Sequence, residues 1–158
     1  MHITGDYTQH NIQEWKVGIV VSRFNELITK SLAETAILTL SKAGLNTHHI
    51  DLLWVPGAHE IPLILQSLAK QKKYQGLIAL GCVIKGDTAH FDVVVDAVNK
   101  GTLRVSLDHH LPITTGVLTT TNLQQALDRS ESNSVHNKGH EAALALLELI
   151  ALKNSLEA

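Results

Sequence analysis

The fold is decided by the apolar run Val17-Gly18-Ile19-Val20-Val21-Ser22, after which apolar residues return at helical spacing. A short run rich in valine and isoleucine, with apolar side chains on both sides, is typical of a strand buried in a parallel sheet. The residues that then share one helical face are Leu27, Ile28, Leu32, Ala36, Ile37 and Leu40. Gly44 follows where a helix can end in a left-handed residue. The sequence therefore predicts a strand and a helix that covers it.

The same alternation continues along the chain. It predicts further strands over 50–55, 77–84 and 113–118, and helices over 61–68, 89–107, 123–129 and 142–153. Strands that alternate with helices favour a parallel sheet covered on both faces. We therefore expect an α/β fold, a three-layer α/β/α sandwich with a four-stranded, mainly parallel sheet.

No repeat, Pro/Gly-rich linker or charge block divides the 158 residues, so we expect a single domain over 1–158. Residues 1–14 form an arm without a partner in this scheme. Such an arm is either frayed or docked on a neighbouring subunit, and pairing with a sheet edge is the simplest docking chemistry. We expect the docked state.

Composition excludes several classes of protein. A net charge of −2 gives no excess of positive charge for a nucleic-acid backbone, so we expect no nucleic-acid partner. Cys82 is the single cysteine and cannot form an internal disulfide, which favours a reducing compartment and predicts a cytoplasmic protein. No stretch approaches the roughly 18 apolar residues that cross a bilayer, and no basic start precedes an apolar stretch. We expect neither export nor membrane insertion.

Ligands of open α/β sheets bind beyond the carboxyl ends of the strands. Four unusual segments fall there, at 22–25, 56–62, 85–90 and 119–122. In the third, Gly86 frees the backbone to turn, while Asp87 and Thr88 are good helix caps. Amides at the start of a helix suit a phosphate, although a plain capped helix start explains the same residues. His90 would lie one turn further, where an imidazole can exchange protons near neutral pH.

Other candidates have competing structural explanations. Phe24, at a strand tip, has a ring that can stack on a heteroaromatic ligand or pack in the core. Glu60 opens a helix, where it either interacts with the helix dipole or accepts hydrogen bonds from hydroxyl groups. Arg129 and Lys138 flank a polar loop and are either phosphate ligands or solvated charges. The ten histidines include His136 and His140 at i,i+4 spacing, but no glutamate follows His136 directly, so we expect no metal site.

Taken together and in order, these segments resemble the lumazine synthase family, which makes 6,7-dimethyl-8-ribityllumazine in the penultimate step of riboflavin biosynthesis. The resemblance spans about residues 15–153. It rests on five stretches in register, namely 17–25 (VGIVVSRFN), 54–62 (WVPGAHEIP), 81–92 (GCVIKGDTAHFD), 116–120 (GVLTT) and 137–139 (NKG).

The resemblance implies a flavodoxin-like fold and a condensation of 5-amino-6-(D-ribitylamino)uracil with 3,4-dihydroxy-2-butanone 4-phosphate, with release of phosphate and water. It implies no cofactor and no metal. By similarity, His90 carries protons, and the phosphate is held by Gly86, Asp87, Thr88 and Arg129. The substrate-binding residues implied are Phe24, Ala58, His59, Glu60, Cys82, Val83, Ile84, Thr115 and Lys138.

The resemblance also implies partners. In this family the site is shared between adjacent subunits, so Arg129 and Lys138 would arrive from a neighbour in a homo-oligomer with the pentamer as its minimum unit. Riboflavin synthase is a further candidate partner. The loop 130–137 lacks the Gly-Thr-Lys-Ala-Gly character of members that form icosahedral shells, which favours pentamers or pairs of pentamers.

Two departures keep a second function open. Thr115 replaces an aromatic residue of many members, which predicts a smaller and more polar wall of the pyrimidine pocket. His59 replaces the usual phenylalanine or tyrosine and adds a titratable group beside the ribityl site. A non-catalytic flavin- or lumazine-binding assembly of the same fold is therefore the alternative. An electron carrier of flavodoxin type fits less well, because the phosphate loop after the first strand is missing.

Overall fold

The predicted strands form in the computed structural model, which describes residues 1–86, 90–132 and 134–158. They are β1 (Val17–Ser22), β2 (Ile50–Val55), β3 (Gly76–Ile84) and β4 (Ile113–Thr120). The sheet has the order β2-β1-β3-β4, and each of these neighbours pairs in parallel. The prediction of a mainly parallel sheet is confirmed.

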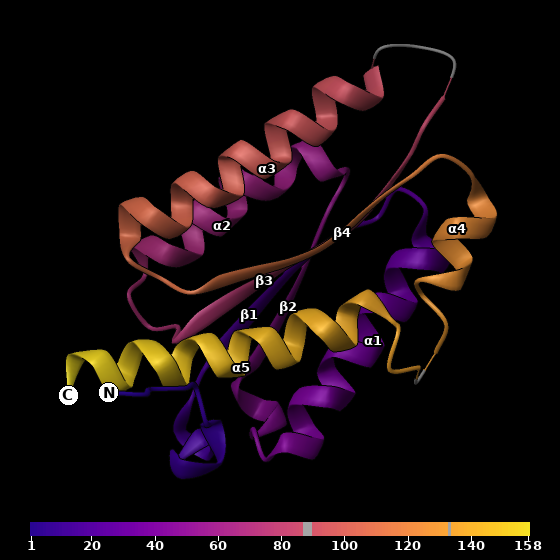
Figure 1. The fold of residues 1–158 in the computed structure, drawn as a ribbon. Helices are drawn as coiled ribbons and strands as arrows, with labels where there is room; N and C mark the ends of the chain where they lie inside the picture. Colours follow the sequence, from indigo (N-terminus) through magenta and orange to yellow (C-terminus); the bar gives the residue numbers. More distant parts are fainter. Residues whose placement is uncertain (87–89, 133) are drawn as a thin grey trace.

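Helices cover both faces of the sheet and give three layers (Figure 1). One face is covered by α1 (Glu26–Ala43) and α5 (Lys138–Glu157), and the other by α2 (Ile61–Lys70) and α3 (His90–His109). The short helix α4 (Leu123–Asp128) follows β4. This arrangement is the predicted three-layer α/β/α sandwich of flavodoxin-like type.

The strand alternation explains why two hydrophobic cores form. Along β1, Val17, Ile19 and Val21 pack toward α1 and α5, whereas Val20 packs toward α2 and α3. Every residue of β1 is buried, as its run of consecutive apolar residues predicts. The central strands are therefore packed on both faces, and this packing fixes the position of their carboxyl ends.

Helix ends follow local chemistry. Gly44 ends α1 with a φ of 115°, as its place in the sequence predicts. The last helix begins at Lys138, earlier than predicted, because the Asn137 side chain accepts hydrogen bonds from the amides of Gly139 and His140.

Two apolar residues differ from the prediction. Leu27 on α1 and Leu103 on α3 are 79% and 60% exposed, although the helical spacing of apolar residues predicts that Leu27, and Leu103 together with Phe91, Val94, Val95 and Val98, point inward. In α3 the buried stripe runs through Val94, Val98, Thr102 and Val105, and Leu103 lies about 100° away from its neighbour on that stripe. Neither residue belongs to the cores of this chain.

The N-terminal arm contacts its own chain. It contains two short 3-10 helices, η1 (Tyr7–Gln9) and η2 (Ile12–Glu14), and Ile12 and Trp15 are buried in the core beside α1 and α5. Its docking on a neighbouring subunit stays a prediction. No helix in the described part of the chain is long and apolar enough to cross a membrane.

Candidate active site

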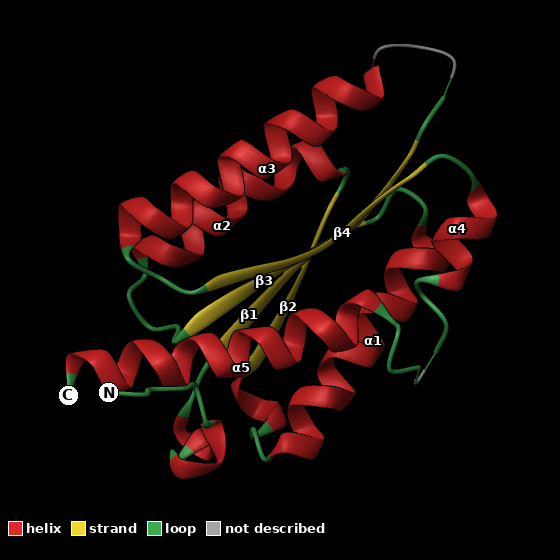
Figure 2. Cartoon of the chain, viewed as in Figure 1, coloured by secondary structure: helices red, strands yellow, loops and turns green. Residues whose placement is uncertain are grey.

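Three strand ends bring the predicted segments together. Because β1, β2 and β3 run in parallel, their carboxyl ends lie together at one end of the sheet (Figure 2). The backbone amide of Arg23 donates to the carbonyl of Val55 at 2.8 Å, and that of Phe24 donates to the carbonyl of Pro56 at 3.1 Å. These bonds fix the turn after β1 against the segment after β2.

A cavity of about 710 Å³ opens at this end of the sheet. Its volume lies within the range of roughly 300–1,000 Å³ that suits small organic ligands. Its walls come from the turn after β1, the segment between β2 and α2, the end of β3 and the first turns of α3. The predicted site residues that line it are Phe24, Ala58, His59, Glu60, Cys82, Val83, Ile84, Gly86 and His90.

Phe24 presents an exposed ring to this cavity. The side chain is 71% exposed, which excludes core packing within this chain. The next residue, Asn25, has a left-handed backbone with a φ of 63°, a conformation that asparagine adopts more readily than most residues. Its side-chain Nδ2 donates to the carbonyl of Cys82 at 3.1 Å. Asn25 thereby ties the turn that carries Phe24 to the end of β3, a role that sequence analysis missed.

The segment between β2 and α2 supplies the polar wall. It forms the short 3-10 helix η4 (Ala58–Glu60), in which Ala58 is buried while His59 and Glu60 are exposed. His59 Nδ1 lies 3.6 Å from Glu60 Oε2. Glu60 stands directly before α2, where the positive end of the helix dipole favours a carboxylate. This carboxylate can accept hydrogen bonds from ligand hydroxyl groups.

The end of β3 supplies an apolar wall. Cys82 is buried, and burial raises the pKa of its thiol to about 11. The thiol therefore stays protonated at neutral pH and is a poor nucleophile. Val83 and Ile84 follow it and are half-buried. Together with the Phe24 ring, this wall can enclose a flat heteroaromatic ligand.

His90 is the first residue of α3 and lines the cavity beside Gly86. An imidazole there can move protons to and from a bound ligand. A Cβ added at Gly86 would meet no atom of the described residues within 4 Å. Asp87 and Thr88 lie outside the described residues, and their part in a phosphate site stays a prediction.

Three predicted site residues do not line this cavity, namely Thr115, Arg129 and Lys138. Arg129 and Lys138 form a second group, which we call the edge cluster. All three are exposed. The amide of Lys138 donates to the carbonyl of Arg129 at 2.9 Å, and Gly116, next to Thr115, packs against the backbone of Lys138. The Lys138 ammonium lies 2.8 Å from Glu141 Oε2. Arg129 and Lys138 therefore lie together beside the edge strand β4. The Thr115 side chain shares the alternation of Ile113 and Val117 and points toward the face that α2 and α3 cover.

Further residues line the cavity that sequence analysis did not assign to a site, namely Pro56, Gly57, Phe91, Val93 and Val94. Helical spacing could have predicted two of them. Val93 and Val94 follow His90 by three and four residues and therefore share its side of α3. They extend the apolar wall toward the turn that carries Phe24.

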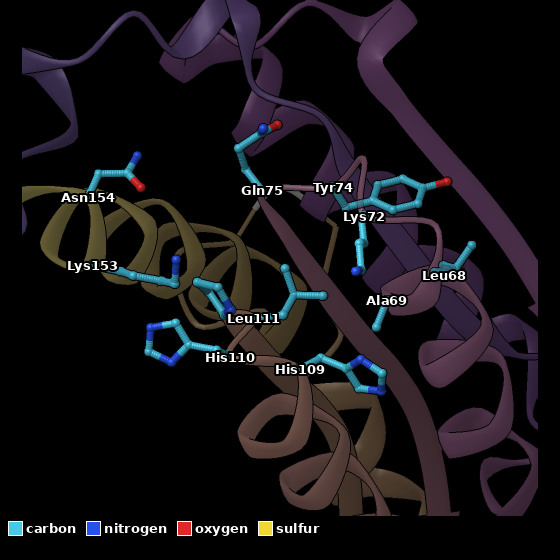
Figure 3. Close-up of a pocket in the computed structure, with 11 residues that line it drawn as sticks. Leu68, Ala69, Lys72, Tyr74, Gln75, His109, His110, Leu111, Lys153 and Asn154 are labelled. Atoms are coloured by element: carbon cyan, nitrogen blue, oxygen red, sulfur yellow. The ribbon is translucent and has the colours of Figure 1, made fainter. Parts of the chain in front are cut away.

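A second cavity, of about 350 Å³, lies at the opposite end of the sheet, where β3 and β4 begin. Figure 3 shows Lys153 from α5 near His110, while His109, the last residue of α3, lies farther away along the lining. The Glu157 carboxylate pairs with two of these side chains. Its Oε1 lies 2.7 Å from His110 Nε2, and its Oε2 lies 3.0 Å from Lys153 Nζ. The negative ends of α2 and α3 favour basic side chains here. Helix ends thus explain this lining without a ligand. Among the described residues, no three His, Cys, Asp or Glu side chains are grouped to hold a metal ion.

Comparison with known proteins identifies one family. The family model described as 6,7-dimethyl-8-ribityllumazine synthase matches residues 14–154, which include the cavity and the edge cluster. Among solved structures, the chain is similar to a de novo designed Rossmann fold protein. The two share 17% sequence identity, with 74% of this chain and 99% of that chain covered and a TM-score of 0.38. A similarity of that size carries no argument about function, so the family match decides.

Proposed function

Because the chain belongs to the 6,7-dimethyl-8-ribityllumazine synthase family, we propose that it condenses 5-amino-6-(D-ribitylamino)uracil with 3,4-dihydroxy-2-butanone 4-phosphate. The family makes it an enzyme of riboflavin biosynthesis. The observation that carries the proposal is the cavity, which combines an aromatic ring (Phe24), a polar wall (His59 and Glu60) and an imidazole (His90).

Each wall suits one part of the two substrates. The pyrimidine lies between the Phe24 ring and the apolar end of β3, and its ribityl chain reaches the segment Ala58–Glu60. The phosphate of the second substrate lies near Gly86, at the start of α3, with Asp87 and Thr88 and with Arg129 as its guanidinium partner. The arrangement brings the amine of one substrate to the ketone of the other.

The chemistry requires orientation and proton transfer. The amine adds to the ketone and loses one water to give an imine, phosphate is then eliminated, and ring closure releases a second water. His90 accepts and returns the protons of these steps, since an imidazole exchanges protons near neutral pH. Orientation of two bound substrates supplies much of the acceleration. The reaction draws on no cofactor and no metal.

A shared site explains why the edge cluster lies apart from the cavity. We propose that Arg129, Lys138 and Thr115 of one subunit complete the cavity of the adjacent subunit in a homo-oligomer built from pentamers. Supporting this, all three residues are exposed in the single chain, and the backbones of Arg129 and Lys138 are hydrogen-bonded to each other. Riboflavin synthase, which uses the product, is a proposed partner, and a cytoplasmic location is proposed from the single buried thiol.

A direct assay tests this function. The purified chain is mixed with both substrates, and formation of 6,7-dimethyl-8-ribityllumazine is followed by absorbance. Arg129→Ala should raise KM for the phosphorylated substrate far more than KM for the pyrimidine, because it removes one phosphate contact. His90→Ala should lower kcat and leave some activity, since orientation remains. No product from the wild-type chain, or equal effects of Arg129→Ala on both KM values, would contradict the assignment.

A non-catalytic flavin- or lumazine-binding assembly is the second candidate. Thr115 and His59, at positions that shape the pocket in the family, favour it. Tight riboflavin binding by the purified chain, with no lumazine formed from the two substrates, would select this function over catalysis.

A further inference from the structure

The polar wall of the cavity contains two adjacent ionisable side chains. His59 and Glu60 both line the cavity, and their side chains are 63% and 47% exposed. His59 Nδ1 lies 3.6 Å from Glu60 Oε2, close enough for an ion pair once the imidazole is protonated. A ligand hydroxyl group that donates to Oε2 therefore competes with His59 for that oxygen.

Local backbone structure holds this pair in place. The amide of Glu60 donates to the carbonyl of Gly57 at 3.2 Å, and buried Ala58 anchors the short helix η4 beneath. Pro62 stands in the first turn of α2, where its fixed φ suits the start of a helix. His59 and Glu60 thus project from an anchored turn and not from a mobile loop.

We propose that His59 makes recognition of the hydroxyl-bearing chain of the ligand dependent on pH, by pairing with Glu60 when protonated and releasing it when neutral. This proposal rests on the proposed function, which brings a ribityl chain to this wall. Histidine changes charge in the neutral range, so the competition acts under ordinary conditions. Ligand affinity falls as the pH is lowered.

The other groups around the cavity do not replace this pair. Among the described residues that line it, Glu60 is the only carboxylate. Cys82, on β3, packs in the core beside α1 and α5, and its thiol stays protonated because burial raises its pKa to about 11. His90 faces it from α3 and is the remaining group that can add a pH dependence. Arg23 and Lys85, the charged residues that follow β1 and β3, do not line the cavity.

The experiment measures binding of the product, 6,7-dimethyl-8-ribityllumazine, by its fluorescence at pH 5.5 and pH 7.5. An exposed ion pair is a modest interaction, so we expect Kd of the wild-type chain to be about two- to fivefold higher at pH 5.5. In His59→Phe and in His59→Gln the two Kd values should agree, because neither side chain titrates. Binding of 6,7-dimethyllumazine, which lacks the ribityl chain, should not change between these pH values.

His48→Phe is the matched control. His48 is likewise exposed in a short 3-10 helix, η3 (Thr47–His49), but at the opposite end of β2. It should keep the wild-type pH dependence. If Kd still depends on pH in both His59 variants, the dependence belongs to His90 and the proposal is overturned. Tighter binding of the product to the wild-type chain at pH 5.5 than at pH 7.5 also overturns it. Failure of the wild-type chain to bind product or form it at either pH overturns the proposed function as well.

Discussion

Replacing Gly139 by alanine tests a close approach between α1 and α5. Gly139 is buried in the first turn of α5. A Cβ at this position would overlap the carbonyl oxygen of Leu32 and lie 2.9 Å from its carbonyl carbon. Non-bonded carbon atoms prefer about 3.5–4.0 Å, so the two helix backbones must separate by about 1 Å.

The magnitude follows from two opposing effects. Alanine favours a helix over glycine by about 1 kcal/mol. Overpacking costs about 1–3 kcal/mol, and the upper end applies because the obstacle is backbone and not a flexible side chain. The net loss is about 2 kcal/mol, and at about 2–4 °C per kcal/mol Tm should fall by about 4–8 °C.

Thermal unfolding followed by circular dichroism measures the change. Gly86→Ala is the matched control, because among the described residues a Cβ there meets no atom within 4 Å and Gly86 does not have a positive φ. Its Tm should stay within about 2 °C of the wild-type value. A Gly139→Ala protein as stable as the wild type would refute the argument that this glycine sets the packing of α5 on α1.

Three further predictions concern single side chains. Burial raises the pKa of the Cys82 thiol to about 11, so iodoacetamide at pH 8 should label the native chain slowly and the unfolded chain quickly. The Tyr74 hydroxyl donates a hydrogen bond to the Asp51 carboxylate at 2.6 Å. This hydrogen bond is the main cause of the lowered pKa of Asp51. This contribution is present at neutral pH and lost as the pH falls through the lowered pKa, so Tyr74→Phe should cost about 1 kcal/mol of unfolding free energy at pH 7 and less below about pH 4. Asn137→Ala removes the cap of α5 and the bond to the Glu131 carbonyl, and should cost about 1–2 kcal/mol in urea unfolding.

The elements were predictable where a local rule acts alone. The run over β1 identifies a buried strand because every residue in it is apolar or small, and Gly44 identifies a helix end because it adopts a positive φ. The cavity residues were predictable for a related reason. In a parallel sheet the carboxyl ends of the strands lie at the same end of the sheet, so Phe24 and Glu60 line one cavity although they lie far apart in sequence.

Contacts between distant segments were not predictable from such rules. The bond from Asn25 Nδ2 to the Cys82 carbonyl depends on the register of β1 against β3, which no local pattern encodes. The exposure of Leu103 depends on which stripe of α3 meets α2. The separation of Arg129 from the cavity likewise follows from where α4 ends relative to β4.

That separation gives a sharp prediction about assembly. Phe24→Asp damages the cavity and Arg129→Glu damages the edge cluster, and both positions are exposed, so both variants should fold. If each site joins the cavity of one subunit to the edge cluster of the next, a random equal mixture restores about one quarter of the sites, since each half is intact with a chance of about one half. The two variants are unfolded together, refolded and assayed for lumazine formation.

A mixture of Phe24→Asp with His90→Ala is the control, because both changes damage the cavity. No mixed site in that oligomer has an intact cavity, so its activity should not exceed the average of the two separate variants. The same lack of recovery in the first mixture would mean that one chain supplies the whole site, because each chain then carries its own defect wherever it assembles. Arg129 would then have to reach the cavity of its own chain by a rearrangement of α4, and the shared site would be wrong.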